Sequence, residues 1–113
     1  MAASKTDEFA DQDIVLAEFA KAISHPARIA ILKLLAMRTT CICGEIVDEL
    51  PLSQSTVSQH LKALKEAGLI QGEIEGPKTC YCLSDSGIAK FEKLFPQFLG
   101  KIITGLQKSK KCC

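Results

Sequence analysis

Six cysteines are the most reactive side chains of this 113-residue chain, and they occur as three close pairs. Cys41-Ile42-Cys43 and Cys80-Tyr81-Cys82 are Cys-x-Cys pairs, and Cys112-Cys113 follows a basic tail. Thiolates bind soft metal ions and metalloids, and they also oxidise reversibly. The polar, acidic start MAASKTDEF is no secretory signal, and no apolar run is long enough to span a bilayer. We therefore expect a cytoplasmic protein with no membrane partner, whose cysteines serve metal or redox chemistry rather than a disulfide framework.

The spacing of Cys41 and Cys43 constrains the backbone that carries them. On a regular helix, residues i and i+2 point to different sides and cannot easily share one ion. On an extended segment they share a face, roughly 6.6 Å apart at Cα, within reach of a common thiophilic centre. We therefore predict that this pair lies on an extended stretch, or on a helix start that deforms when a ligand binds.

The stretch SQSTVSQHLKALKEAGL, residues 53–69, has the pattern of a helix that is buried on one side and polar on the other. Val57, Leu61 and Leu64 fall on one stripe, opposite a polar stripe that includes Gln59 and Lys62. Ser53 is a good N-cap and Gly68 a good residue just past the helix end. Such a helix can present its first turns to base edges and phosphates.

The segments on either side of this helix predict a winged helix-turn-helix. Residues 44–50 form a short amphipathic segment, and Pro51-Leu52 breaks it before the longer helix. After the helix, two strand-like runs surround a Gly76-Pro77 turn. We expect one mainly α domain over residues 1–113, with the helix-turn-helix at about 44–68 and a β-hairpin wing at about 69–83.

The predicted hairpin determines where the second cysteine pair lies. A two-residue turn gives a register in which the core side carries Ile70, Gly72, Ile74, Thr79, Tyr81 and Leu83. Cys80 and Cys82 then share the other, exposed face with Gln71 and Glu73. In winged helices a short strand before the reading motif commonly pairs with the returning wing strand, which would bring Cys41 and Cys43 alongside. We predict one thiolate cluster from Cys41, Cys43 and one or both of Cys80 and Cys82.

Helices are also expected at about residues 8–23, from Ser24 as N-cap with Pro26 in the first turn, and at about 84–106. The last of these carries more apolar residues than one small domain can cover. We therefore expect the first and last helices to form a symmetric dimer interface. Pro96 should kink or interrupt the last helix. Two reading helices related by a two-fold axis imply an inverted-repeat DNA operator.

The net charge is only +1, so attraction to phosphates must be local. The wing has Glu73 and Glu75 near its tip and Lys78 as its cation, so its contribution is small or limited to Lys78. His60 lies between the two faces and is expected to be partly buried. Arg28, Lys33 and Arg38 form a solvated face or contact phosphate. The predicted base and phosphate contacts are Gln54, Ser55, Ser58 and Gln59, with Thr56 and Lys62 beside them.

Four segments together resemble the ArsR/SmtB family of metal-responsive repressors. They are SHPARIAILKLL (24–35), CICGEIVDEL (41–50), LSQSTVSQHLKALKEAGLI (52–70) and TCYCLS (79–84). The resemblance implies a dimeric winged-helix repressor that needs no cofactor to bind DNA and loses operator affinity when an inducer binds. Arsenic and cadmium sensors of the family are similar in carrying a Cys-x-Cys pair before the first reading helix. The family's usual arsenic sensor lacks a cysteine pair in the wing, so the resemblance does not imply that Cys80 and Cys82 are ligands.

The predicted inducer follows from the ligand types. A site of thiolates alone selects soft ions, and the two histidines, His25 and His60, are far from the cysteine pairs in sequence. The last helix lacks the His and carboxylate ligands of the family's zinc sensors, and no cysteine precedes Cys41 as in its cadmium and lead sensors. Three thiolates suit As(III) or Sb(III), whereas four suit cadmium, lead or zinc. Cys112 and Cys113 are further candidate ligands, from the same or the partner protomer.

Two alternatives to an ion-released repressor remain open from the sequence. The same fold can serve as a thiol redox or persulfide sensor, in which paired cysteines oxidise and no ion is needed. A structural zinc-binding module would hold its metal constitutively. An enzyme is not expected, because the chain has no Cys-x-x-Cys redox signature, no nucleophile with a nearby base and no phosphate-cradling glycine loop.

Overall fold

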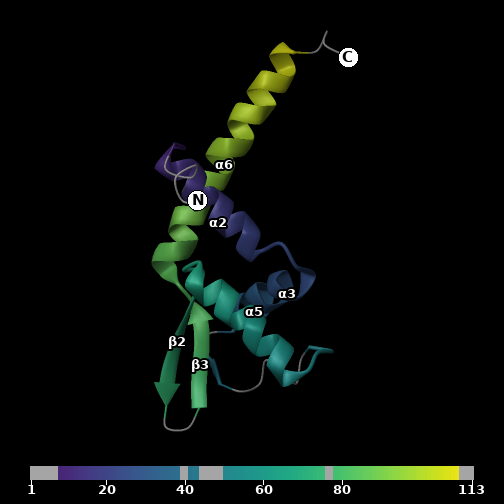
Figure 1. Cartoon of the computed structure of the whole chain (residues 1–113), viewed down its shortest axis with the longest axis vertical. Helices are drawn as coiled ribbons and strands as arrows, with labels where there is room; N and C mark the ends of the chain where they lie inside the picture. Colours follow the sequence, from purple (N-terminus) through teal and green to yellow (C-terminus); the bar gives the residue numbers. More distant parts are fainter. Residues whose placement is uncertain (1–7, 39–40, 44–49, 76–77, 110–113) are drawn as a thin grey trace.

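The computed structural model describes residues 8–38, 41–43, 50–75 and 78–109. Within these residues, four helices and three strands follow one another in the order expected of a winged helix-turn-helix (Figure 1). Most of the helix predicted over residues 44–50, and the Gly76-Pro77 turn, lie outside the described residues. The elements are α2 (Asp11–Ala22), α3 (Pro26–Ala36), β1 (Ile42–Cys43), α5 (Gln54–Glu66), β2 (Ile70–Glu75), β3 (Lys78–Leu83) and α6 (Asp85–Lys108).

Both predicted ends of the reading helix α5 are confirmed. Ser53 Oγ accepts a hydrogen bond from the Thr56 amide at 3.4 Å. At the other end Gly68 adopts a φ of 85°, a left-handed conformation that favours glycine. The Gly68 and Leu69 amides then donate back to the carbonyls of Lys65 and Leu64 at 3.0 and 3.1 Å. This is the Schellman arrangement, and it turns the chain directly from α5 into the wing.

The start of α3 differs from the prediction that Ser24 is its N-cap. The cap is His25, whose Nδ1 accepts from the Ala27 amide at 2.9 Å. Ser24 instead donates its hydroxyl hydrogen to the Lys21 carbonyl at 2.6 Å, at the end of α2. Pro26 occupies the first turn of α3 as expected, where its missing N–H leaves no bond unmade.

The last helix, α6, is continuous from Asp85 to Lys108 and contains Pro96. Of the two outcomes predicted for Pro96, an interruption of this helix is therefore wrong, and a kink stays a prediction. The helix starts tightly packed, because a Cβ on Gly87 would overlap the Gly68 carbonyl just past the end of α5. The Ser84 amide also donates to the Leu69 carbonyl at 3.0 Å. The end of the reading helix is thus fixed against the start of α6.

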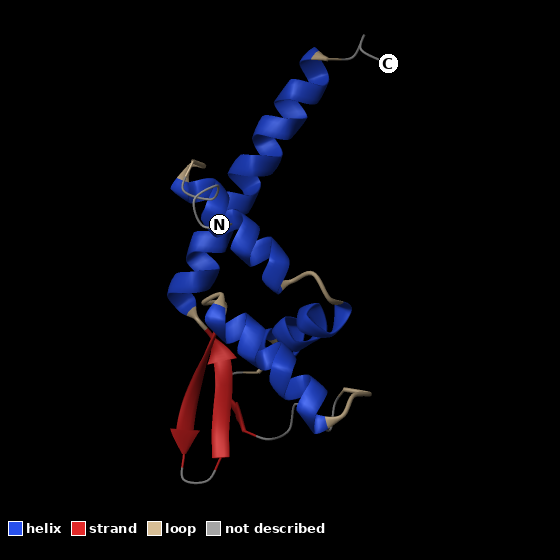
Figure 2. Cartoon of the chain, in the orientation of Figure 1, coloured by secondary structure: helices blue, strands red, loops and turns tan. Residues whose placement is uncertain are grey.

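The sheet confirms both predicted strand pairings. β3 lies between β1 and β2, and both neighbours run antiparallel to it. In the hairpin, Ile70 pairs with Leu83, Gly72 with Tyr81, and Ile74 with Thr79. Gly72 accommodates the aromatic neighbour, since a Cβ there would lie 3.2 Å from Tyr81 Cε1. In the second pair, Ile42 lies opposite Tyr81 and Cys43 opposite Cys80. The segment before the reading motif is therefore joined to the returning strand of the wing (Figure 2).

The core lies where α3, α5 and the sheet meet, and it includes the predicted apolar stripe of α5. Residues from the other helices close it, and Phe19 of α2 packs on Phe91 of α6 with ring centroids 5.3 Å apart. The buried apolar cluster consists of Phe19, Ala22, Ile31, Leu35, Ile42, Val57, Leu61, Leu64, Leu69, Ile70 and Leu94. Burial of this cluster fixes which face of α5 is left for solvent.

Beyond its crossing with α2, α6 extends away from the other described elements (Figures 1 and 2). This half of the helix keeps large apolar side chains 39–68% exposed. They are Phe95, Phe98, Leu99, Ile102, Ile103 and Leu106. An exposed apolar patch on an otherwise ordinary surface marks an interaction site. Among the described helices, none combines the length and apolarity that crossing a membrane would need.

Candidate DNA-binding surface and cysteine site

The polar face of α5 gathers most of the predicted DNA-contacting residues on one exposed surface. Its buried side, formed by Val57, Leu61 and Leu64, holds the helix against the core. The described first turn holds no acidic residue, so the positive end of the helix dipole is not neutralised there. The exposed predicted residues are Gln54, Ser55, Ser58, Gln59 and Lys62.

Two predicted DNA contacts are placed differently from the rest. Thr56 is half-buried, and its hydroxyl lies 2.9 Å from Ser53 Oγ in the cap of α5. Its polar group therefore belongs to the cap as much as to the exposed face. Lys78 is the first residue of β3, and its side chain lies outside the described part of the structure.

His60, on the same helix, is buried as expected, with 8% of its surface exposed. Its Nδ1 accepts a hydrogen bond from Arg28 Nε at 3.0 Å, and its ring lies 4.5 Å from that of His25. Since arginine stays protonated, His60 must be neutral at Nδ1 to accept this bond. Burial lowers the pKa of His60, and the charges of His25 and Arg28 lower it further.

Arg28 joins three helices, a role that sequence reasoning missed. Its Nη1 donates to the carbonyls of Lys21 and Ala22, at 3.4 and 3.3 Å, at the C-terminal end of α2. A cation there also complements the helix dipole. With the bond to His60, this polar junction of Arg28, His25 and His60 connects α2, α3 and α5. Arg28 is therefore committed to internal contacts rather than to a DNA phosphate.

The cysteine pairs meet across β1 and β3. Cys43 lies directly opposite Cys80, and the same register continued by one residue brings Cys41 opposite Cys82. Residues directly opposite each other share one face, with Cβ atoms about 4.5–5.5 Å apart. The four positions thus occupy two adjacent rows of one face of the sheet, opposite to the face of Ile42 and Tyr81. The predicted neighbourhood of the two Cys-x-Cys segments is confirmed at the level of the backbone.

The surroundings of the wing cysteines differ from the prediction. Cys80 is only 1% exposed, and Cys82 is half-buried, whereas both were expected to be exposed. The hairpin rule misses this because β3 is the central strand, so Cys80 has Cys43 on one side and Glu73 on the other. Cys80 is also disulfide-bonded, while Cys41 and Cys82 are in the thiol form.

A complete metal site cannot be assembled from the described side chains alone. Among them, no group of three His, Cys, Asp or Glu residues could hold a metal ion. The side chain of Cys43, the fourth member of the set, lies outside the described part of the structure, as do Cys112 and Cys113. The donors that the register gathers are all sulfur, which is the chemistry that soft ions prefer.

Comparison with known proteins identifies the family. Residues 25–71 match the family model described as bacterial regulatory protein, arsR family. An uncharacterized HTH-type transcriptional regulator of Methanocaldococcus jannaschii is 42% identical over 79 residues, which cover 69% of this chain and 88% of that protein. The chain belongs to the arsR family. It is accordingly a transcriptional regulator with a winged helix-turn-helix for binding DNA, and the family's members are regulators rather than enzymes.

Two further ArsR-family proteins are informative. The HTH-type transcriptional repressor SmtB of Mycobacterium tuberculosis is 43% identical over 72 residues, which cover 64% of this chain but only 53% of that repressor. A homodimeric winged helix-turn-helix DNA-binding domain from Mycobacterium bovis has a TM-score of 0.57 at 28% identity, with 85% of this chain and 81% of that chain covered. Regulators of the family respond to metal ions as inducers, and the comparisons leave the ion open.

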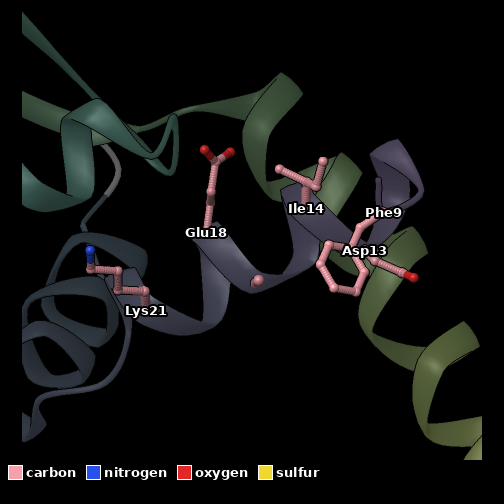
Figure 3. Close-up of a pocket in the computed structure, with 6 residues that line it drawn as sticks. Phe9, Asp13, Ile14, Glu18 and Lys21 are labelled. Carbon is pink, nitrogen blue, oxygen red and sulfur yellow. The ribbon is translucent and has the colours of Figure 1, made fainter. Parts of the chain in front are cut away.

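A hollow of about 420 Å³ in this ArsR-family chain lies away from both candidate sites. Figure 3 shows its lining side chains along α2, with Phe9 and Asp13 toward α6 and Lys21 toward α3. The described residues that line it are Phe9, Asp13, Ile14, Ala17, Glu18 and Lys21. Among them there is no cysteine and no residue of the polar α5 face, so neither the inducer nor DNA is expected there.

Proposed function

We propose that this ArsR-family regulator is a dimeric repressor whose operator affinity falls when a thiophilic metalloid, As(III) or Sb(III), binds its cysteines. The proposed ligands are Cys41, Cys43, Cys80 and Cys82. The observation that carries the proposal is the antiparallel register in which Cys43 faces Cys80. It brings two segments that are far apart in sequence, each with a Cys-x-Cys pair, onto one face of one sheet.

The donor set favours a metalloid over harder ions. Nearby histidines would favour zinc, but His25 and His60 are engaged with each other and with Arg28 at the polar junction. Three of the four thiolates would satisfy As(III) or Sb(III). Recruitment of all four would instead favour cadmium, lead or zinc, so the ligand number is coupled to the identity of the ion.

The route from the cysteines to DNA runs through the sheet and the core. Ile42 lies between Cys41 and Cys43 and is buried in the same apolar cluster as Val57 and Leu61 of α5. A ligand that draws the cysteines together would shift Ile42 against the reading helix. Because cores are densely packed, α5 would have to move in response. A coupling of about 1–3 kcal/mol lowers affinity roughly 5- to 150-fold, which is enough for release.

DNA binding is assigned to the exposed polar face of α5, with amides and hydroxyls for base edges and Lys62 for a phosphate. Operator recognition would use two copies of this face, related by the dimer two-fold axis, on half-sites about 34–36 Å apart. The exposed apolar side chains of α6, together with α2, supply the dimer interface. The homodimeric relative from Mycobacterium bovis supports this assembly.

The test is release from operator DNA, measured by fluorescence anisotropy in a buffer reduced with a phosphine rather than a dithiol, because dithiols bind arsenite. Arsenite, antimonite, cadmium and zinc are titrated against wild type, Cys41→Ser/Cys43→Ser and Cys112→Ser/Cys113→Ser. We expect arsenite and antimonite to release wild type and the tail variant, but not the Cys41→Ser/Cys43→Ser variant. Release by no ion would overturn the proposal and redirect the search to oxidants and persulfides.

A further inference from the structure

The disulfide at Cys80 indicates a second chemistry at the cysteine face. Cys80 is disulfide-bonded, and its neighbour two residues along β3, Cys82, is a thiol, as is Cys41. The residue directly opposite Cys80 on β1 is Cys43. Within the sheet, the register therefore assigns Cys43 as the partner of Cys80.

Geometry favours this pair over the others. A disulfide needs Cβ atoms about 3.5–4.5 Å apart, which directly opposite residues of an antiparallel pair approach. Cysteines two apart on one strand are roughly 6.6 Å apart at Cα, near the upper limit for a disulfide, with side chains that are parallel rather than convergent. The other two cysteines, Cys41 and Cys82, are half-buried and lie opposite each other just before the start of β1.

We propose that Cys43 and Cys80 form a redox lock on the inducer site. When they are joined, two of the four candidate thiolates are lost, and the two that remain are too few for a three-thiolate metalloid centre. The oxidised protein then stays on its operator and ignores the inducer. This consequence rests on the proposed function, whereas formation of the crosslink and retention of DNA binding do not.

The oxidation balances with a peroxide as the oxidant. The Cys43 thiolate attacks one oxygen of hydrogen peroxide, the O–O bond breaks, and a sulfenic acid and water form after proton uptake. The Cys80 thiol then attacks the sulfenic sulfur, the S–S bond forms, and a second water leaves. Two thiols and one peroxide thus give one disulfide and two waters. An external reductant, such as a phosphine or a dithiol, reverses the reaction.

The retention of DNA binding follows from the form that the structure describes. With Cys80 disulfide-bonded, α5 is capped by Ser53, its polar face is exposed, and the sheet is paired on both sides of β3. The crosslink is therefore compatible with the reading conformation. It also ties β1 to β3, which restrains the movement of Ile42 that release requires.

The test uses full-length protein oxidised with hydrogen peroxide and then freed of it. Peptide mass spectrometry should find a Cys43–Cys80 crosslink, and operator affinity should stay within about twofold of the reduced protein. The arsenite concentration for half-release should rise at least tenfold, in the range of typical allosteric couplings, and return after phosphine treatment. Cys43→Ser should form no crosslink to Cys80, whereas Cys41→Ser should still form it, because Cys43 and not Cys41 lies opposite Cys80.

Each failure has a distinct meaning. Absence of the crosslink from wild type overturns the lock, as does loss of operator affinity on oxidation, which would make oxidation itself the inducing signal. Arsenite release of oxidised and reduced protein at equal concentrations overturns the lock and leaves the proposed function standing. Reduced protein that no metalloid releases overturns the proposed function, and with it the lock's effect on induction.

Discussion

The reading helix α5 is held by two regions that differ in chemistry, the polar junction and the cysteine face. At the junction, Arg28 is hydrogen-bonded to His60 and to two carbonyls at the end of α2. At the cysteine face, the strands bring together thiols that can bind ions or oxidise. The first region is built to keep one geometry, and the second offers groups whose bonding can change. We infer that the junction sets the resting position of α5, and that regulation enters through the sheet.

The substitution Arg28→Ala is the strongest test of the stabilising role of the polar junction. The substitution removes the Arg28 donor from His60 Nδ1 and from the Ala22 carbonyl, both in a partly buried place, whereas the Lys21 carbonyl keeps its bond from Ser24. We expect the free energy of unfolding to fall by about 2–3 kcal/mol, measured by urea denaturation. Lys33→Ala removes a charge from the exposed side of the same helix and should cost about 0.5 kcal/mol or less. Equal losses of stability in the two variants would contradict the claim that the polar junction holds α5 in place.

The opposite result is expected at the cysteine face. Cys41→Ser/Cys82→Ser changes two half-buried atoms and should leave the free energy of unfolding within about 1 kcal/mol of wild type. The arsenite concentration for half-release should nevertheless rise at least tenfold, because only two of the four candidate thiolates remain. Arg28→Ala, by contrast, should leave that concentration nearly unchanged in protein that is still folded. If both variants alter stability and induction alike, the two regions do not have separate roles.

A smaller effect distinguishes the polar junction from the cysteine face, because His60 makes the free energy of unfolding depend on pH. The pKa of His60 is lowered in the folded state, so the unfolded chain takes up a proton first as the pH falls. Stability from neutral His60 is therefore present above its unfolded pKa of about 6.5 and is lost as the pH falls through the lower folded value. His60→Asn keeps an acceptor oxygen near the position of Nδ1 but cannot titrate. Urea unfolding at pH 7.5 and 5.5 should differ less for this variant than for wild type.

The elements of both regions were predictable from the sequence to different degrees. The hairpin register followed from alternation along the strands and the turn length, which fix which residues oppose each other. The pairing of β1 with β3 was predicted from the common topology of winged helices instead. The ends and the buried stripe of α5 followed from Ser53, Gly68 and helical periodicity. The register and the features of α5 depend on residues that are near in sequence, or on one repeating pattern.

The remainder depends on contacts that no local pattern encodes. Arg28 looked like a surface charge because its partners lie on two other helices, and Cys80 looked exposed because a hairpin alone does not include the third strand. Ser24 was the better cap by residue type, but its hydroxyl is used by the preceding helix. Pro96 was compatible with a continuous helix, since a helix can lose one backbone hydrogen bond when its neighbours hold it.

The smallest expected effect tests whether DNA contact is separate from both regions. Lys62 is exposed on the polar face of α5, and Lys62→Ala should weaken operator binding about three- to tenfold and reduce the salt slope by about one per lysine. Lys65→Ala removes the same charge from the last turn of the helix and should change both quantities less. Neither variant should alter the free energy of unfolding or the arsenite concentration for half-release. If Lys62→Ala shifts the arsenite response, the reading face and the inducer site are coupled more directly than through the core beneath α5.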